Sequence, residues 1–372
     1  MRFAYFALSI CAAVFFGGCD IPVEHFPPND LYALVVSTGR HTPTDLASQD
    51  TTAVVEDWFG TPLEPRWPTE QFGDAAAKNL VNPLNLTRAA GPVYSDQDNR
   101  HFGLFAEHCV TCHGVSGGGD GPASLLQNPY PRDFRAGIYK WKSTPGSAKP
   151  TRDDLTAILV HGAPGSGMPS FQSLSDEDRE ALVDYVIFLS VRGEFERRMI
   201  SGAIDELGYE DTRPEQDASL LSVIDATDET DAWWLARETL DRIAGKWVEA
   251  NAKVIPVPEE TPFDADSIQR GDAIFHGQIA NCSGCHGDQG NPDLVPEKYE
   301  YDEWTKEFTS RLSITPTDRD AVRPFRKAGA LRPRQIYPRK LSLGVYRGGG
   351  DPDSLYRRLV SGIPGTPMPG VL

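Results

Sequence analysis

Cysteine, methionine and histidine are scarce in this chain: its 372 residues include six, four and eight of them, respectively. Basic side chains are also outnumbered, because 36 lysines and arginines stand against 53 aspartates and glutamates, for a net charge of −17. This balance argues against nucleic-acid binding, which relies on lysine and arginine to neutralise phosphates. An acidic surface is instead suited to docking on a basic patch of a partner protein.

Long apolar runs are missing as well, since no segment after the N-terminus reaches the length of a membrane span. At the N-terminus, Arg2 precedes a short apolar stretch, two glycines and Cys19, an order that predicts an export signal over residues 1–18. The residues before Cys19 resemble the bacterial lipobox. We therefore expect Cys19 to carry lipid and to hold the protein at the periplasmic face of a bacterial membrane. An ordinary secretory signal that is cut nearby is the alternative.

Apart from Cys11 in the signal and Cys19, the cysteines form two Cys-x-x-Cys pairs, each followed by histidine. The two triplets are Cys109, Cys112 and His113, and Cys282, Cys285 and His286. This spacing is typical of c-type haem attachment, because two thiols on one helical turn can each bond a haem vinyl group while the histidine binds the iron. Half of a zinc site or a redox dithiol is the alternative, but zinc needs a further ligand pair and a dithiol does not need the histidine.

A second repeat predicts the ligand on the other side of each iron. DDLTAILVHGAPGSGMP at 153–169 aligns without a gap with DSLYRRLVSGIPGTPMP at 353–369, at an offset of 200. The apolar positions predict a short helix in each copy, which ends at a glycine before a Met-Pro loop. Two of the four methionines, Met168 and Met368, stand in this loop, so we expect them to be axial iron ligands. Three other histidines are alternatives: His108, His161 and His276.

These motifs resemble those of class I cytochromes c, specifically two-haem bacterial respiratory cytochromes. The resemblance implies a mainly α fold with two small haem domains in tandem, at 98–195 and 263–372. The last helix of such a domain fits residues 175–192 of the first copy. The second copy lacks that helix, so we expect the chain that ends at Leu372 to be a fragment.

The remaining segments are predicted to connect and support these domains. Residues 19–97 are rich in proline, threonine, aspartate and asparagine, and are expected to form a tether with some packing on the first domain. Residues 196–262 are expected to be a linker that includes a helix over 231–254. The second copy also holds 27 extra residues between its attachment motif and its Met loop, and 293–312 is expected to contain part of them.

A basic stretch precedes each Met loop, in contrast to the acidic chain as a whole. Side chains in these stretches are candidates for holding the haem propionates or for forming a docking surface, and a solvated loop is the alternative. The residues singled out for propionate contacts are Arg135, Trp141 and Arg334.

The resemblance implies an electron carrier rather than an enzyme, because histidine and methionine on both irons would leave no open site for a substrate. It also implies transfer between a quinol-oxidising complex or dehydrogenase and a terminal oxidase. A haem subunit of a larger oxidase or dehydrogenase complex is the alternative. A dihaem peroxidase is a third interpretation, which would need one iron with an open or displaceable ligand.

Overall fold

The computed structural model describes residues 23–214, 218–226, 230–259, 262–295 and 300–371. The predicted export signal and Cys19 lie outside these ranges. Within them the regular secondary structure is helical, apart from two short antiparallel pairs, β1–β2 and β3–β4, in which Tyr94 pairs with Phe102 and Glu300 with Ile336. The mainly α fold predicted from the sequence is therefore confirmed. None of the helices in the described ranges is long and apolar enough to cross a membrane.

The helices and strands have the following bounds: α2 (Asp30–Arg40), α3 (Asp45–Phe59), α4 (Ala75–Lys78), α5 (Pro83–Ala89), β1 (Tyr94–Ser95), β2 (His101–Phe102), α6 (Leu104–His108), α7 (Val110–His113), η1 (Ser124–Leu126), η2 (Phe134–Ala136), α8 (Arg152–His161), α9 (Asp176–Asp205), α10 (Leu220–Ile224), α11 (Asp231–Val248), η3 (Ala250–Lys253), α12 (Ala265–His276), α13 (Ser283–His286), η4 (Pro292–Leu294), β3 (Glu300–Tyr301), α14 (Glu303–Leu312), α15 (Arg319–Lys327), β4 (Gln335–Ile336), η5 (Leu341–Leu343) and α16 (Pro352–Ser361).

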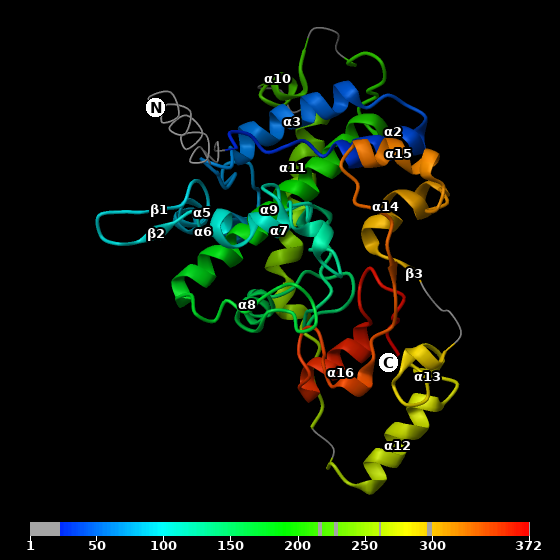
Figure 1. The fold of residues 1–372 in the computed structure, drawn as a ribbon. Helices are drawn as coiled ribbons and strands as arrows, with labels where there is room; N and C mark the ends of the chain where they lie inside the picture. The colour runs from blue at the N-terminus through cyan, green and yellow to red at the C-terminus, as the bar shows by residue number, and fades with distance from the viewer. Residues whose placement is uncertain (1–22, 215–217, 227–229, 260–261, 296–299, 372) are drawn as a thin grey trace, which may run out of the picture.

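Helix α9 runs through the centre of the molecule (Figure 1). The Ser175 hydroxyl accepts a hydrogen bond from the backbone N–H of Asp178, and acidic residues in the first turn suit the helix dipole. The helix was predicted over 175–192 but continues to Asp205. It extends because its later turns stay apolar on the buried side, where Phe195 and its neighbours lie in the core.

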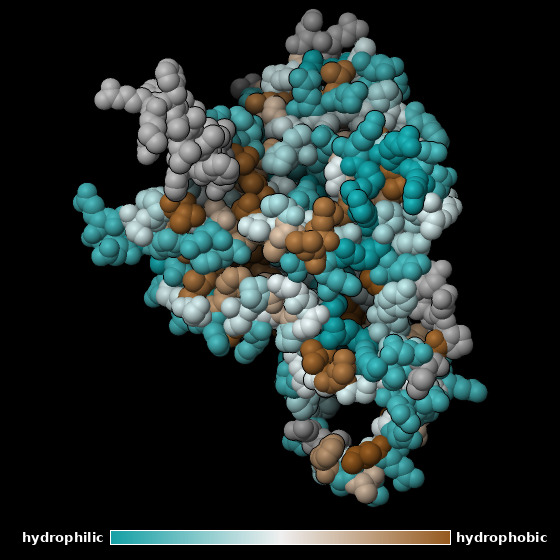
Figure 2. All heavy atoms as spheres, viewed as in Figure 1, coloured by the Kyte–Doolittle hydropathy of each residue, from teal (hydrophilic) through white to brown (hydrophobic). Residues whose placement is uncertain are grey.

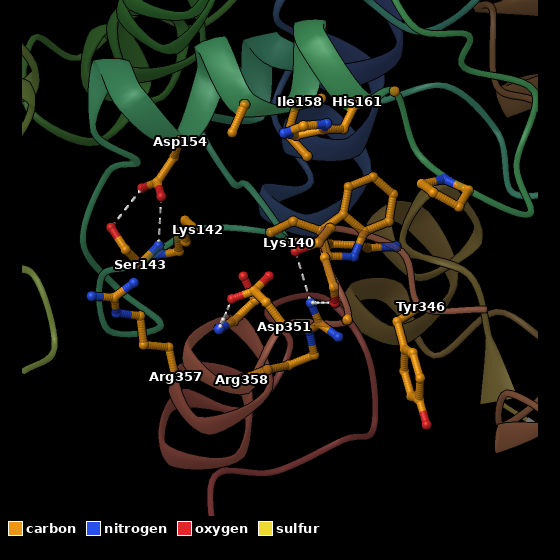
Figure 3. Close-up of a pocket in the computed structure, with 18 of the residues that line it drawn as sticks. Lys140, Lys142, Ser143, Asp154, Ile158, His161, Tyr346, Asp351, Arg357 and Arg358 are labelled. Atoms are coloured by element: carbon orange, nitrogen blue, oxygen red, sulfur yellow. Dashed lines mark hydrogen bonds between the residues drawn. The ribbon is translucent and has the colours of Figure 1, made fainter. Parts of the chain in front are cut away.

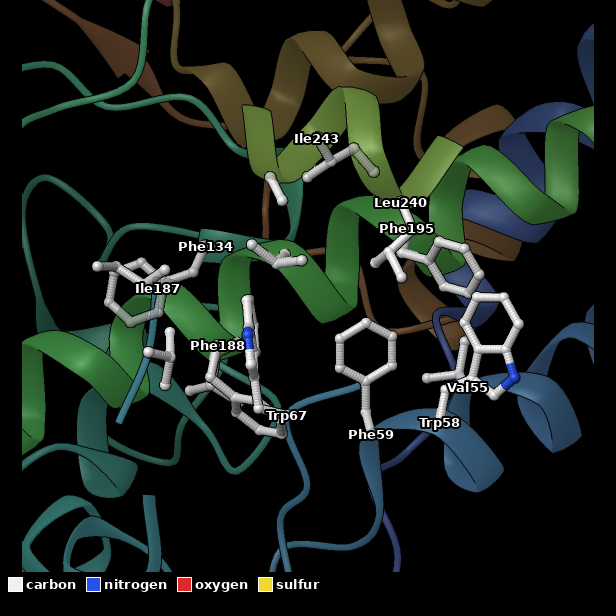
Figure 4. Close-up of a cluster of buried hydrophobic side chains, with 14 of the residues drawn as sticks. Val55, Trp58, Phe59, Trp67, Phe134, Ile187, Phe188, Phe195, Leu240 and Ile243 are labelled. Atoms are coloured by element: carbon white, nitrogen blue, oxygen red, sulfur yellow. The ribbon is translucent and has the colours of Figure 1, made fainter. Parts of the chain in front are cut away.

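The predicted tether at 19–97 is helical instead, and α3 and α5 pack on α9. Trp58 stacks on Phe195 with ring centroids 5.2 Å apart, and Phe59 lies between α3 and α9 (Figure 4). The prediction missed these helices because polar residues typical of loops act here as helix caps. The capping residues are Asn29, Asp74 and Asn82.

The segment between the two haem-motif regions also belongs to this core. Helix α11 and the short η3 correspond to the helix predicted over 231–254, which is confirmed. Leu240 and Ile243 of α11 point toward α9 in Figure 4, and Trp247 is buried. Residues 196–262 are therefore in large part packed structure rather than a loose linker.

We call residues 98–195 the first copy and residues 263–372 the second copy. In the second copy, α12, α13 and α16 contribute no buried residue, whereas the inserted helices α14 and α15 pack on α2. The shared cluster of buried residues comprises Leu31, Val35, Tyr130, Trp304, Phe308, Val322, Phe325, Ala330 and Leu331. Figure 1 shows α14 and α15 beside α2, with α12 and α13 extending away from the core. The insertion thus joins the second copy to the N-terminal helices.

Candidate functional site

The first attachment motif and the first Met loop meet at one cavity. The single turn of α7 carries Cys112 and His113, Cys109 precedes it, and Met168 lines the same cavity from the loop after α8. Apolar side chains form much of the remaining wall, including Phe105, Phe134, Leu155, Leu159, Val183 and Val186. A flat apolar group with a metal at its centre fits such a lining, because two thiols, an imidazole and a thioether all reach the cavity.

The imidazole of His113 is oriented by a backbone carbonyl. Its Nδ1 lies 3.1 Å from the carbonyl oxygen of Arg132, which can only accept, so Nδ1 carries the proton and Nε2 keeps a lone pair for a metal. The ring also stacks on Phe134, with centroids 4.7 Å apart. Burial lowers the pKa of His113 to about 4, against the opposing effect of this hydrogen bond, so the ring is neutral near pH 7.

The cysteines of the two motifs form no disulfide within the described residues. Burial raises the pKa of the Cys109 thiol to about 12, so this thiol is protonated near pH 7. In the described ranges, no group of three or more histidine, cysteine, aspartate and glutamate side chains is placed to hold a metal ion. The zinc alternative therefore gains no support from the geometry.

The Met loops have the same backbone hydrogen bonds in the two copies. Each follows a helix that ends at a glycine with positive φ, 65° at Gly162 and 68° at Gly362. The carbonyl of Met168 accepts from the N–H of Ala163 at 3.1 Å, and the carbonyl of Met368 accepts from Ile363 at 3.1 Å. The predicted helix, glycine stop and loop are confirmed in both copies.

The second attachment motif repeats the histidine arrangement of the first. His286 ends the single turn of α13, and its Nδ1 lies 2.9 Å from the carbonyl oxygen of Arg339. This site is more open, because Cys285 is exposed and the neighbouring helices contribute no buried residue. Phe275 is half-buried and packs on His276, whereas its counterpart Phe105 is buried against α9.

A third repeat, which the sequence analysis missed, supplies the two carbonyls. PRDFRAGIYKW at 131–141 corresponds to PRKLSLGVYRG at 338–348, at an offset of 207. Both segments form a 3-10 turn that ends at a glycine with positive φ, Gly137 and Gly344. The shared Pro-Arg pair followed by Gly-x-Tyr was the available signal, and the different offset concealed it.

The candidate propionate residues lie in three different environments. Trp141 lines the cavity of the first copy. Arg135 is buried and does not line that cavity, because its guanidinium is held by Asp133 at 3.0 and 3.1 Å. Arg334 lies over the ring of Tyr130, 3.6 Å from its centroid, and donates to the carbonyl of Gln127. Both arginines have protein partners here, and the contacts with propionates stay a prediction.

The alternative histidine ligands are also separated. His108 lines the cavity of the first copy. His161 lies instead on the groove between the copies, at the end of α8. His276 has both ring nitrogens 3.0 Å from backbone carbonyls, those of Asp272 and Asp288. Of the three, His108 is the one that shares a cavity with the first attachment motif.

A groove of about 470 Å³ separates the two copies, and equivalent elements face each other across it (Figure 3). Helix α8 of the first copy lies on one side and α16 of the second on the other. Five pairs of positions at the offset of 200 line it: Asp154 and Ser354, Ala157 and Arg357, Ile158 and Arg358, His161 and Ser361, and Gly162 and Gly362. The two copies therefore meet through the same face of their structure.

Comparisons with known proteins agree with this geometry. Residues 97–186 match the family described as "Cytochrome C oxidase, cbb3-type, subunit III". The chain is 36% identical over 124 residues to cytochrome c55X of Stutzerimonas stutzeri, a match that covers 33% of this chain and 91% of that protein.

A solved chain of the reducing HAO-like protein complex of Kuenenia stuttgartiensis is 22% identical, with a TM-score of 0.43, over 72% of this chain and 84% of that chain. This last similarity is too weak to carry a conclusion. The match to cytochrome c55X, in contrast, extends over nearly all of that protein. The chain belongs to the cytochrome c family, whose members bind haem c covalently and transfer electrons to redox partners.

Proposed function

We propose that this protein is a membrane-anchored dihaem cytochrome c that carries electrons between respiratory redox partners. The observation that carries the proposal is the duplication of every part of the site: attachment motif, histidine-orienting carbonyl and Met loop. When bound, haem c supplies an iron that changes oxidation state by one electron. Cys109 and Cys112 would hold one group and Cys282 and Cys285 the other, with axial ligands from His113, Met168, His286 and Met368.

The side chains have defined tasks in such a carrier. Arg132 and Arg339 orient the histidines through their carbonyls, which leaves Nε2 free and strengthens the imidazole as a ligand. The Met loops, closed by their own hydrogen bonds, would supply the thioethers of Met168 and Met368 as the second ligands. Thioether ligation raises the reduction potential, which suits a carrier that works near a terminal oxidase. An iron held by both a histidine and a methionine would leave no position open to peroxide, which disfavours the peroxidase interpretation.

The haem content and the ligands are tested together. Haem quantification should give two haems per chain, and a redox titration should give two high-potential transitions. Met168→Ala and Met368→Ala should each lower one transition and weaken the Met–iron absorption band. Met199→Leu is the matched control, because Met199 is fully buried in the core and lies outside both loops. A single haem per chain, or an unchanged band in either alanine variant, would contradict the proposal.

The anchor is proposed to be lipid on Cys19, from the lipobox-like residues before it. Mass spectrometry of the mature protein should find an acylated N-terminal cysteine, and Cys19→Ser should release the protein from the membrane fraction. Periplasmic localisation follows from the same signal. A mature N-terminus elsewhere without lipid would remove the anchor from the proposal while leaving the carrier intact.

A haem subunit of a larger oxidase or dehydrogenase complex is the second candidate. It is favoured by apolar side chains exposed on and around α12, which Figure 2 shows on the lower part of the molecule. The residues are Phe263, Ile268, Ile274 and Ile279. Solubilisation in mild detergent followed by purification should separate the two candidates, because a subunit would retain a stoichiometric partner and a carrier would not.

A further inference from the structure

Two arginines of the third repeat each contact both copies. Arg132 and Arg339 occupy equivalent positions, and their carbonyls hold the histidine of their own copy, at 3.1 and 2.9 Å. Their side chains are not needed for that hydrogen bond. In both cases the guanidinium contacts the other copy: that of Arg339 at the first Met loop, and that of Arg132 at Glu303, beside the second Met loop.

The side chain of Arg339 reaches the first Met loop directly. Its Nη1 donates to the carbonyl oxygen of Gly165 at 3.3 Å, and Nη2 of Arg347 donates to the same oxygen at 2.9 Å. The contact is tight, because a Cβ at Gly165 would lie 2.7 Å from Nη2 of Arg339. Two cations of the second copy thus hold a loop of the first, three residues before Met168.

The side chain of Arg132 reaches the second Met loop through a carboxylate. It donates to Oε2 of Glu303, the first residue of α14, and Nζ of Lys140 lies 3.7 Å from the same oxygen. A Cβ at Gly365 would lie 2.6 Å from the carboxyl carbon of Glu303. Lys140 and Arg347 also occupy equivalent positions in the third repeat. Both connections between the copies therefore use basic residues at the same two positions of the repeat.

Glu303 is held in a protein environment rather than in solvent. Its side chain is 21% exposed, and Oε1 is buried with no hydrogen-bond partner among the described residues. Burial acts to raise the pKa of Glu303, but the charges of Arg132 and Lys140 outweigh it and the pKa is lowered. The carboxylate is therefore ionised, and its charge acts at short range on both copies.

We propose that Arg132 and Arg339 couple the two haem sites, with Glu303 as the bridge on one side. Each arginine orients the histidine of its own copy by its backbone and supports the Met loop of the other copy by its side chain. The inference rests on the proposed function, since it requires two haems. Its consequence is that removing one bridging charge changes the reduction potentials of both sites. An anion near an iron favours the oxidised state, and a cation favours the reduced state.

The experiment is a redox titration of the purified haem-loaded full chain, followed at the haem absorption bands. Glu303→Gln should raise both transitions, because Glu303 lies between Arg132 of the first copy and the Met loop of the second. Arg339→Gln should lower both, because the guanidinium of Arg339 lies on the first Met loop while its own backbone carbonyl holds His286. Glu249→Gln and Arg323→Gln are matched controls with the same charge change at exposed ion pairs, and should leave both transitions in place. Glu303→Asp, which keeps the charge, should give a smaller shift than Glu303→Gln.

The outcomes separate this inference from the proposed function. A wild-type protein with a single transition would overturn both. Two wild-type transitions, of which Glu303→Gln and Arg339→Gln move one or none, would overturn the coupling alone. Equally large shifts in the control variants would also overturn the coupling. The potentials would then respond to the net charge of the protein rather than to these contacts. Thermal unfolding and the Met–iron band identify a variant that has lost its fold, and the other of Glu303→Gln and Arg339→Gln then carries the test.

Discussion

One backbone carbonyl selects the tautomer of each of the two proposed haem-ligand histidines, His113 and His286. Residue type alone leaves both ring nitrogens of His113 and His286 available as donors or ligands. The carbonyls of Arg132 and Arg339 accept from Nδ1 and so select the tautomer. The sequence pointed to these histidines through their place after Cys-x-x-Cys, but their orienting groups lie 19 and 53 residues downstream.

Asp50 is the residue whose charge we expect to matter most for the stability of the N-terminal helices. It is buried and accepts hydrogen bonds from Arg213, from the hydroxyl of Tyr209 and from the N–H of Leu220. Burial acts to raise the pKa of Asp50, but these hydrogen bonds outweigh it and hold the pKa below 3.8. We expect Asp50→Asn to cost about 1.5–3 kcal/mol of unfolding free energy near pH 7.

The pH dependence of that cost has a definite sign. Because the folded pKa of Asp50 is lowered, its stabilising contribution is complete above 3.8 and is lost as the pH falls through the folded value. The difference between wild type and Asp50→Asn should therefore shrink in acid. Urea unfolding between pH 3 and pH 7 measures it. Asp57→Asn on the exposed side of α3 is the control, and a difference that grows in acid would contradict the assignment.

At the scale of elements, the Met loop depends on the glycine that ends its helix. A Cβ at Gly162 would lie 2.7 Å from the carbonyl carbon of Pro169 and 2.8 Å from the carbonyl oxygen of Met168. This glycine therefore provides both a positive φ and the close approach of the returning chain. The equivalent contacts recur at Gly362, so the sequence match of the two loops reflects a shared backbone requirement.

Gly162→Ala should displace the Met loop as well as strain the backbone. Gly208→Ala is a matched control, since Gly208 also has positive φ, at 71°, but has nothing within 4 Å of an added Cβ. Backbone strain alone costs about 1–3 kcal/mol in either variant. Only Gly162→Ala should also weaken the Met–iron band of the haem-loaded protein. An intact band in that variant would mean that the loop tolerates the added methyl group.

Across the whole molecule, the inserted helices α14 and α15 attach the second copy to the N-terminal helices. Phe308 is fully buried in the shared cluster and stacks on Phe325 with centroids 5.0 Å apart. Arg197 of α9 adds an ion pair with Glu307 at 2.6 Å. The second copy is thereby held through its insertion, since its own haem-motif helices bury no residue.

Phe308→Ala should loosen this attachment. We expect a loss of about 3–5 kcal/mol, the usual cost of truncating a buried phenylalanine. Hydrogen exchange should become faster in α2, α14 and α15 and should stay unchanged in α9. Phe263→Ala is the matched control, because Phe263 is 92% exposed. Unchanged exchange in α2 would show that the cluster does not carry the attachment.

The sequence by itself determined the local features: the attachment motifs, the glycine-stopped helices and the Met loops. These depend on covalent spacing and on backbone conformations that only a few residue types adopt, so they can be recognised within a short stretch. Only the tertiary structure decided that 19–97 is packed helix, that the insertion docks on α2, and that Arg132 and Arg339 reach the other copy. Those contacts join residues far apart in the chain, and their pairing is set by packing, which no local pattern encodes.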